Sequence, residues 1–212
     1  TIVKPFELRS GGLALGTGAA ATDVAIAAGA GATATGSGAC ALGSNAQASN
    51  DSSFALGNGV QASGIGSVAI GENSQASSDR AFALGSGAQA SGTNSVAIGE
   101  NSTATGFQSA AFVGGQATGS FSFAIGATAS GDGSFAKGPF CLAEGKESTA
   151  FGGLFLHSRA FRSTTFGQFN ATDSGWDTVN WVATDPILQV GNGADLGSRS
   201  DCFTLLKNGN LT

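Results

Sequence analysis

A glycine recurs every fourteen residues through the middle of the chain, and each time it closes a short apolar phrase such as Phe54-Ala55-Leu56-Gly57. The series consists of Gly43, Gly57, Gly71, Gly85 and Gly99. A fixed period of this length is typical of a solenoid, in which each repeat buries its apolar residues against the next repeat. The period therefore predicts an elongated repetitive body, and it favours function on a long surface over function in a pocket.

The pattern within one repeat predicts two short strands and two corners. Residues three and one positions before the glycine share a face, because side chains alternate along a strand. The core rungs predicted on that face are Leu42, Phe54, Leu56, Val68, Ile70, Phe82, Leu84, Val96 and Ile98. A second strand such as Val60-Gln61-Ala62 follows, and Ser, Gly, Asn or Asp residues close the repeat. We predict an all-β, parallel β-roll with 14-residue coils.

An alanine lies between the two large residues of each rung, on the opposite face of the strand. These alanines are Ala55, Ala69, Ala83 and Ala97. A stripe of methyl groups lets the backbones of neighbouring chains approach closely. A monomer with so thin an interior would bury little apolar area against its loss of backbone entropy. The sequence therefore predicts a homo-oligomer in which the alanine stripe faces the partner chains.

The repeat is less regular outside residues 40–106. Near the N-terminus, Val24-Ala25-Ile26 is followed by Ala27 where a glycine is expected. Beyond Gly99 the spacing of the closing glycines changes, and 11 of the 15 phenylalanines lie between Phe107 and Phe169. We expect this enrichment to mark a wider core towards that end of the chain.

Two sets of polar residues are candidates for a ligand surface. The first is a column of glutamines on the second strand, which stabilises the stack as an amide ladder or forms a polar stripe for a carbohydrate or protein. Its members are Gln47, Gln61, Gln75 and Gln89. The second is a basic stretch, which forms solvated corners or a patch for an acidic glycan or an envelope lipid. It contains Lys137, Lys146, His157, Arg159 and Arg162.

Composition argues against several other functions. The net charge is −5 and the 14 acidic residues are spread thinly, which disfavours nucleic-acid binding. No apolar run is long enough to insert into a membrane. The three cysteines, Cys40, Cys141 and Cys202, have neither metal-ligand nor disulfide spacing. The single histidine has no adjacent acid or nucleophile in a recognisable arrangement, so we predict no enzyme activity, cofactor or metal. A chain that begins at Thr1 without a methionine is expected to be processed or part of a longer protein.

A family resemblance rests on two phrases, Ser67-Val68-Ala69-Ile70-Gly71-Glu72-Asn73-Ser74 and Ser95-Val96-Ala97-Ile98-Gly99-Glu100-Asn101-Ser102. They resemble the head repeat of YadA-like trimeric autotransporter adhesins, over about residues 13–170. The resemblance implies a left-handed parallel β-roll, three chains side by side, and attachment to host matrix or another surface. It implies nothing specific about the ligand.

The last forty residues are predicted to form a separate cap or connector. Residues 1–12 would lead into the repeats, 13–170 would form the head, and 171–212 would end it. Trp176 and Trp181 lie where the repeat stops, as expected of a capping layer. The segments 185–193 and 203–211 predict two strands of a hairpin. This pair resembles the segment before the chaperone domain of endosialidase-type phage tail fibres.

Together these features predict an extracellular homotrimeric fibre or adhesin head that attaches to a host-matrix or cell-surface protein or glycan. One alternative is the receptor-binding tail fibre of a phage or contractile injection machine. The other is a structural filament subunit without a receptor. The expected location is the bacterial cell surface or the tail of such a particle.

Overall fold

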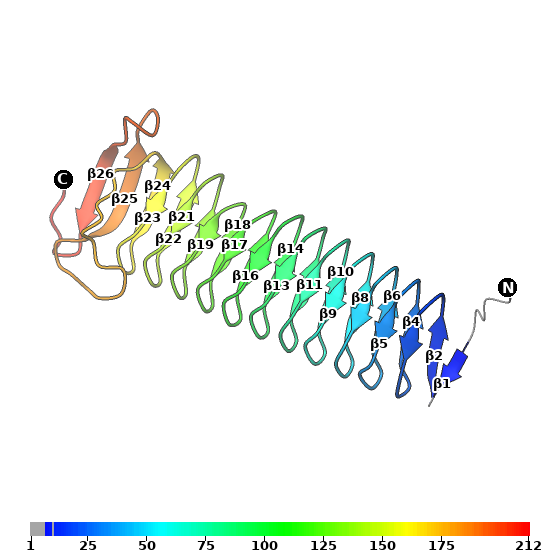
Figure 1. Ribbon diagram of the computed structural model, residues 1–212. Coiled ribbons are helices and arrows are strands. Elements are labelled where there is room, and N and C mark those ends of the chain that lie inside the picture. Colours follow the sequence, from blue (N-terminus) through cyan, green and yellow to red (C-terminus); the bar gives the residue numbers. More distant parts are fainter. Residues whose placement is uncertain (1–6, 10) are drawn as a thin grey trace. The chain divides into compact units, whose positions relative to one another are not determined.

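The computed structural model describes residues 7–9 and 11–212, with side chains from residue 11 onward. They fall into two compact units, Thr1–Gln108 and Ser109–Thr212, referred to here as unit 1 and unit 2. Both units are built from successive coils of the chain that carry short strands (Figure 1), and the described residues contain no helix. The predicted all-β class is confirmed.

Unit 1 contains the strands β1 to β15. Their bounds are β1 (Glu7–Arg9), β2 (Gly12–Leu15), β3 (Ala20–Ala21), β4 (Ile26–Ala28), β5 (Thr33–Ala34), β6 (Cys40–Leu42), β7 (Gln47–Ala48), β8 (Phe54–Leu56), β9 (Gln61–Ala62), β10 (Val68–Ile70), β11 (Gln75–Ala76), β12 (Phe82–Leu84), β13 (Gln89–Ala90), β14 (Val96–Ile98) and β15 (Thr103–Ala104).

In unit 1 each coil gives one strand to each of two parallel sheets. Sheet A has the order β1-β2-β4-β6-β8-β10-β12-β14, and sheet B has the order β3-β5-β7-β9-β11-β13-β15. Paired residues are fourteen positions apart through the regular coils, as in Val68↔Phe82 and Gln75↔Gln89. Strand β1 is antiparallel to β2. The predicted parallel β-solenoid with 14-residue coils is confirmed.

Unit 2 contains the strands β16 to β26. Their bounds are β16 (Ala110–Phe112), β17 (Gln116–Ala117), β18 (Phe123–Ile125), β19 (Thr128–Ala129), β20 (Phe135–Lys137), β21 (Leu142–Ala143), β22 (Thr149–Gly152), β23 (His157–Ser158), β24 (Thr164–Gln168), β25 (Pro186–Asn192) and β26 (Asp201–Leu206).

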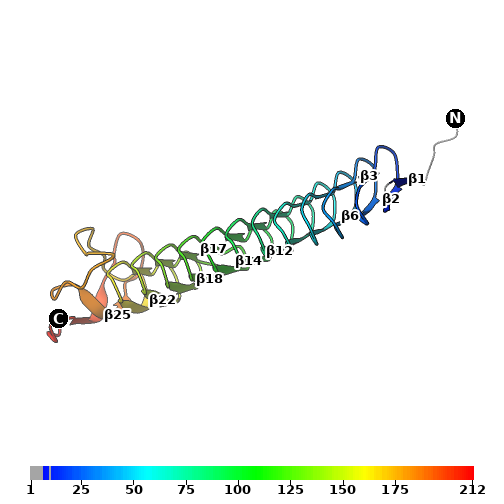
Figure 2. The ribbon, with the colours of Figure 1, turned by 90° about the horizontal axis from the view of Figure 1, so that it is seen from below.

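Unit 2 repeats the same architecture with less regular coils. Its part of sheet A has the order β16-β18-β20-β22-β24-β25-β26, and its part of sheet B has the order β17-β19-β21-β23. Strand β25 continues sheet A in parallel with β24, and β26 then pairs antiparallel with β25. The predicted C-terminal hairpin is therefore confirmed. Figure 2 shows the successive coils of each unit from below.

Small side chains fill the interior of the coils. In unit 1 the second residue of each regular strand is an alanine with 0 % exposure. In sheet A these residues are Ala41, Ala55, Ala69, Ala83 and Ala97, and in sheet B they are Ala48, Ala62, Ala76, Ala90 and Ala104. Buried serines such as Ser53, Ser67 and Ser95 occupy further interior positions. The described core of unit 1 is thus a narrow layer of small side chains, of which Val60 is the largest.

The predicted assignment of the two faces of sheet A is wrong. The alanine stripe Ala55, Ala69, Ala83 and Ala97 lines the inside of the coil. The predicted core rungs lie on the outer face and are half-buried or exposed: Leu42, Phe54, Leu56, Val68, Ile70, Phe82, Leu84, Val96 and Ile98. The reason is the thinness of the coil. Its two sheets lie close enough for methyl groups to fill the interior at close-packed density, and a phenylalanine would overfill it.

The phenylalanines of unit 2 do not widen its core, contrary to expectation. Five of them form a column on the outer face of sheet A, where consecutive ring centroids are 5.3 to 6.3 Å apart. They are Phe112, Phe123, Phe135, Phe151 and Phe166. Others lie on the corners, and Phe121 and Phe140 are 60 % and 69 % exposed. Apart from Phe169, which is 8 % exposed, the phenylalanines of this stretch therefore lie at least partly at the surface.

The repeating glycine is required by the stacking of the corners. Gly57 has a φ of 138°, and a Cβ added to it would lie 2.8 Å from the carbonyl oxygen of Gly71 in the next coil. The same register corrects the expectation for the N-terminal coils. Ile26 pairs with Cys40, so the phrase there is Ile26-Ala27-Ala28 and its glycine is Gly29, with a φ of 139°.

Candidate functional site

The outer face of sheet A in unit 1 is apolar along its whole length. Each regular strand presents two large side chains there, the first and third residues of β8, β10, β12 and β14. Leu56 and Leu84 are 40 % and 37 % exposed, and Ile26 is 42 % exposed. We call this surface the apolar face of unit 1. A contiguous exposed apolar patch on a soluble protein marks an interaction site.

The outer face of sheet A in unit 2 is also apolar and is mostly aromatic. The phenylalanine column provides it, together with Ile125 of β18. One charged side chain interrupts the column: the Nζ of Lys137 lies 5.0 Å from the centroid of the Phe151 ring. Lys137 was predicted to belong to a basic ligand patch, but it lies on sheet A, away from the sheet B strand that carries His157.

The outer face of sheet B is polar by contrast. In unit 1 the predicted glutamine column is aligned in register, with each Gln paired to the next coil. Gln47, Gln61 and Gln89 are exposed and Gln75 is half-buried. The two sheets of unit 1 thus present chemically different outer faces. A ligand role for Gln47, Gln61, Gln75 and Gln89 stays a prediction.

Most of the predicted basic residues are paired with acids that the sequence analysis did not single out. The Nε2 of His157 lies 2.8 Å from the Oε2 of Glu144, and the Nη1 of Arg159 lies 3.7 Å from the same oxygen. Arg162 donates from Nε to the Oε2 of Glu147 at 2.6 Å, which lowers the pKa of Glu147. Of the predicted set, only Lys137 and Lys146 lack an ion pair within the described residues. The region is a mixed-charge network on sheet B and its corners.

Alignment of the irregular coils could have revealed these pairs. Leu142 of β21 pairs with His157 of β23, fifteen positions later. Counting forward from that pair places Glu144 opposite Arg159. The change of coil length hid this relation, because a strict 14-residue step misaligns the two strands by one residue.

Burial lowers the pKa of His157, although its hydrogen bond to Glu144 acts in the opposite direction. A histidine whose pKa is lower in the folded state stabilises the fold above about pH 6.5, and this contribution is lost as the pH falls. We expect the unfolding midpoint of the wild type to fall between pH 7 and pH 5 more steeply than that of His157→Gln, as measured by thermal denaturation. His157 is the only histidine, so its single imidazole resonance reports the pKa directly. A pKa above the ordinary value would contradict this expectation.

A hollow opens in unit 2 where two corners are shortened. In a regular coil the chain advances five residues from the end of a sheet A strand to the start of the next sheet B strand, as from Leu84 to Gln89. From Phe112 to Gln116 it advances four, and from Ile125 to Thr128 only three. The missing residues leave a space of about 330 Å³.

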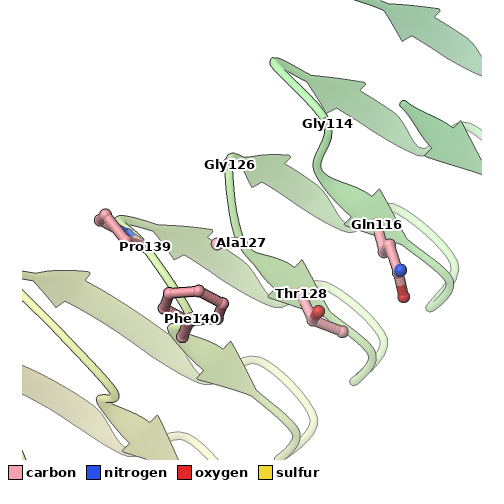
Figure 3. A pocket seen from close by; sticks show the side chains of 7 residues that line it. All are labelled: Gly114, Gln116, Gly126, Ala127, Thr128, Pro139 and Phe140. Carbon is pink, nitrogen blue, oxygen red and sulfur yellow. The ribbon is translucent and has the colours of Figure 1, made fainter. Parts of the chain in front are cut away.

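The hollow has an aromatic wall and a polar side. Its lining residues are Gly114, Gln116, Gly126, Ala127, Thr128, Pro139 and Phe140. In Figure 3 the side chains of Gln116, Thr128 and Phe140 lie in a row across three successive coils. The ring of Phe140 is stacked on Phe155, with centroids 4.7 Å apart and an interplanar angle of 7°. We call this site the Phe140 hollow.

A second cluster, also missed by the sequence analysis, joins the C-terminal hairpin to the coils of unit 2. The side chains of Lys207 and Asp185 are 0 % and 5 % exposed, and the lysine Nζ lies 3.9 Å from the Oδ2 of Asp185. The rings of Trp181 and Phe161 lie 5.1 and 5.6 Å from the same Nζ. Burial lowers the pKa of Lys207, against the attraction of Asp185 and Asp177. The Trp181 ring thus covers one side of a buried charge, and a capping layer formed by Trp176 and Trp181 stays a prediction.

All three cysteines are unpaired, and burial raises the pKa of the Cys40 and Cys141 thiols, which makes them weaker nucleophiles. Within residues 7–9 and 11–212, no group of three His, Cys, Asp or Glu side chains is placed to hold a metal ion. The same residues include no helix of the length and apolarity needed to cross a membrane.

The fold and its surfaces define a parallel β-solenoid with one apolar and one polar outer face. Residues 34–59, 62–88 and 90–112 match the family model described as YadA head domain repeat (2 copies). The predicted YadA-like head is supported over these segments. No part of the match falls on the C-terminal hairpin, so its resemblance to tail-fibre proteins stays a prediction. No curated protein matches the chain.

Proposed function

We propose that this chain is the head of a homotrimeric, extracellular adhesin that attaches a bacterial cell to a surface. The observation that carries the proposal is the apolar face of unit 1, which is too extended and too regular to remain in contact with water. Covering it with the same face of other copies buries the apolar rungs and leaves the glutamine column of sheet B outside. The match to YadA head repeats supports three copies, because heads of that family are trimeric in general.

The proposed trimer acts as a scaffold and carries no chemistry of its own. Each site binds its ligand weakly. When sites on three identical chains bind one surface at the same time, the overall affinity for that surface rises. The partners we propose are a protein or glycan of the host matrix or of a neighbouring cell. The proposed location is the outer surface of the bacterium.

The proposal is tested by attachment and by localisation together. Beads coated with the purified trimer should be retained on host-matrix proteins or on cells, and beads coated with a monomeric variant should be retained much less. An antibody to the chain should label the cell envelope in electron micrographs of the native source. Label on the tails of particles would overturn the adhesin in favour of a tail fibre. End-to-end polymers without retention on any surface would overturn it in favour of a structural filament.

A further inference from the structure

The Phe140 hollow is a built feature of unit 2 that arises from the lengths of three consecutive corners. Two consecutive corners are short, so space opens above Gln116 and Thr128. The next corner regains full length, from Lys137 to Leu142, and places Phe140 at the edge of that space. Phe140 has a positive φ of 56°, which fixes its backbone at the corner.

The phenylalanine ring is held before any ligand arrives. It is the end member of a stack of three rings, in which Phe155 and Phe169 have centroids 5.4 Å apart. Phe169 is 8 % exposed and anchors the stack, whereas Phe140 is 69 % exposed. One face of the Phe140 ring is covered by Phe155, and the ring lines the hollow. A preorganised ring binds a ligand without a further loss of side-chain entropy.

The polar side of the hollow offers neutral hydrogen-bonding groups. Gln116 carries an amide that donates and accepts, and Thr128 carries a hydroxyl that does both. Neither side chain makes a hydrogen bond within the described part of the chain. None of the seven lining residues is charged. This chemistry favours a neutral ligand with hydroxyl groups over an anion or a cation.

We propose that the Phe140 hollow binds a neutral sugar residue of a surface glycan. The C–H face of a pyranose ring packs on the aromatic ring, whose face carries partial negative charge. Its hydroxyl groups then reach the Thr128 hydroxyl on the adjacent coil and the Gln116 amide one coil further along (Figure 3). The volume of the hollow is near the lower end of the range for small-molecule sites, about 300–1,000 Å³. Gln116 and Thr128 begin strands of sheet B, which the proposed trimer leaves outside.

This inference rests on the proposed attachment function and names the ligand class for it. The test uses saturation-transfer NMR on the full chain with the methyl glycosides of glucose, galactose, mannose and N-acetylglucosamine. We expect saturation transfer to at least one of these glycosides. Phe140→Ala should weaken binding by about tenfold or more, because it removes a large apolar contact. Thr128→Val, which changes shape little, should weaken binding through loss of the hydroxyl.

The matched control is Phe121→Ala, which removes another exposed corner ring, 60 % exposed, from outside the hollow. It should leave glycoside binding unchanged, and circular dichroism should confirm that all variants keep their β-structure. Absence of saturation transfer to every glycoside, or equal binding by wild type and Phe140→Ala, would overturn the proposal. Binding of a proline-rich matrix peptide in place of every glycoside, with loss in Phe140→Ala, would also overturn it.

The outcomes for the hollow and for attachment are separable. If Phe140→Ala beads attach to cells as well as wild type and no glycoside binds, the sugar site is wrong and the attachment function stands. If glycosides bind in the hollow and the wild-type beads attach to no surface, the site stands and attachment is wrong.

Discussion

Replacing Leu56 and Leu84 together with aspartate is expected to convert the oligomer of this chain into a monomer. Both side chains lie on the apolar face of unit 1 and are 40 % and 37 % exposed in the single chain. Each leucine buried between chains contributes about 1.5–3 kcal/mol, and a carboxylate left there without a partner costs more. Sedimentation equilibrium should therefore show the mass of one chain for the double variant.

The matched control places the same charges on the other sheet. Gln61 and Gln89 are exposed on the outer face of sheet B, two coils apart as the two leucines are. Replacing both with aspartate should leave the oligomer intact, because this face stays in water. If the leucine variant keeps the mass of the oligomer, or if the glutamine variant loses it, the apolar face is not the contact between chains.

Replacing Ala69 and Ala83 together with leucine is expected to have the largest effect on folding itself. Both alanines are 0 % exposed in the narrow layer between the two sheets of the coil. Three added carbon atoms cannot fit there without separation of the sheets, and overpacking of a core costs about 1–3 kcal/mol or more. Because identical coils stack on one another, the distortion extends to the neighbouring coils. We expect a large fall in the unfolding midpoint and loss of β-structure in the double variant.

The control for these substitutions is Val68→Leu, which adds one carbon beside Ala69 on the outer face of the same strand. It should change the unfolding midpoint little compared with Ala69→Leu. A double alanine variant that melts as the wild type does but no longer forms oligomers would contradict the structure. That result would place the alanines between chains, as the sequence pattern first predicted.

The error about the faces has a simple physical origin. Alternation along a strand determines that Phe54 and Leu56 share one side and that Ala55 lies on the other, and the structure confirms this. It does not determine which side is inside. The usual rule that large apolar residues are buried fails here, because the interior of a 14-residue coil has room only for small side chains, mostly alanine and serine. A single chain therefore buries the alanines of its sheet A strands and leaves the phenylalanines of these strands on the outer face.

Other features differed in how far the sequence could predict them. The period gave the strands of the regular coils, and the turn residues gave the C-terminal hairpin, because both depend on local pattern. The Phe140 hollow and the pairing of Glu144 with His157 depend on coils whose length departs from fourteen. Contacts between irregular coils depend on which residues of neighbouring strands are paired. The 14-residue period does not give this pairing where the coil length changes.

The central claim is that other copies of this chain cover the apolar face of unit 1. Sedimentation equilibrium of the purified wild-type protein over a range of concentrations tests it most directly. The account predicts a mass three times that of the 20.6 kDa chain, which falls to the mass of one chain when Leu56 and Leu84 are aspartate. A wild-type mass of 20.6 kDa at every concentration would contradict it.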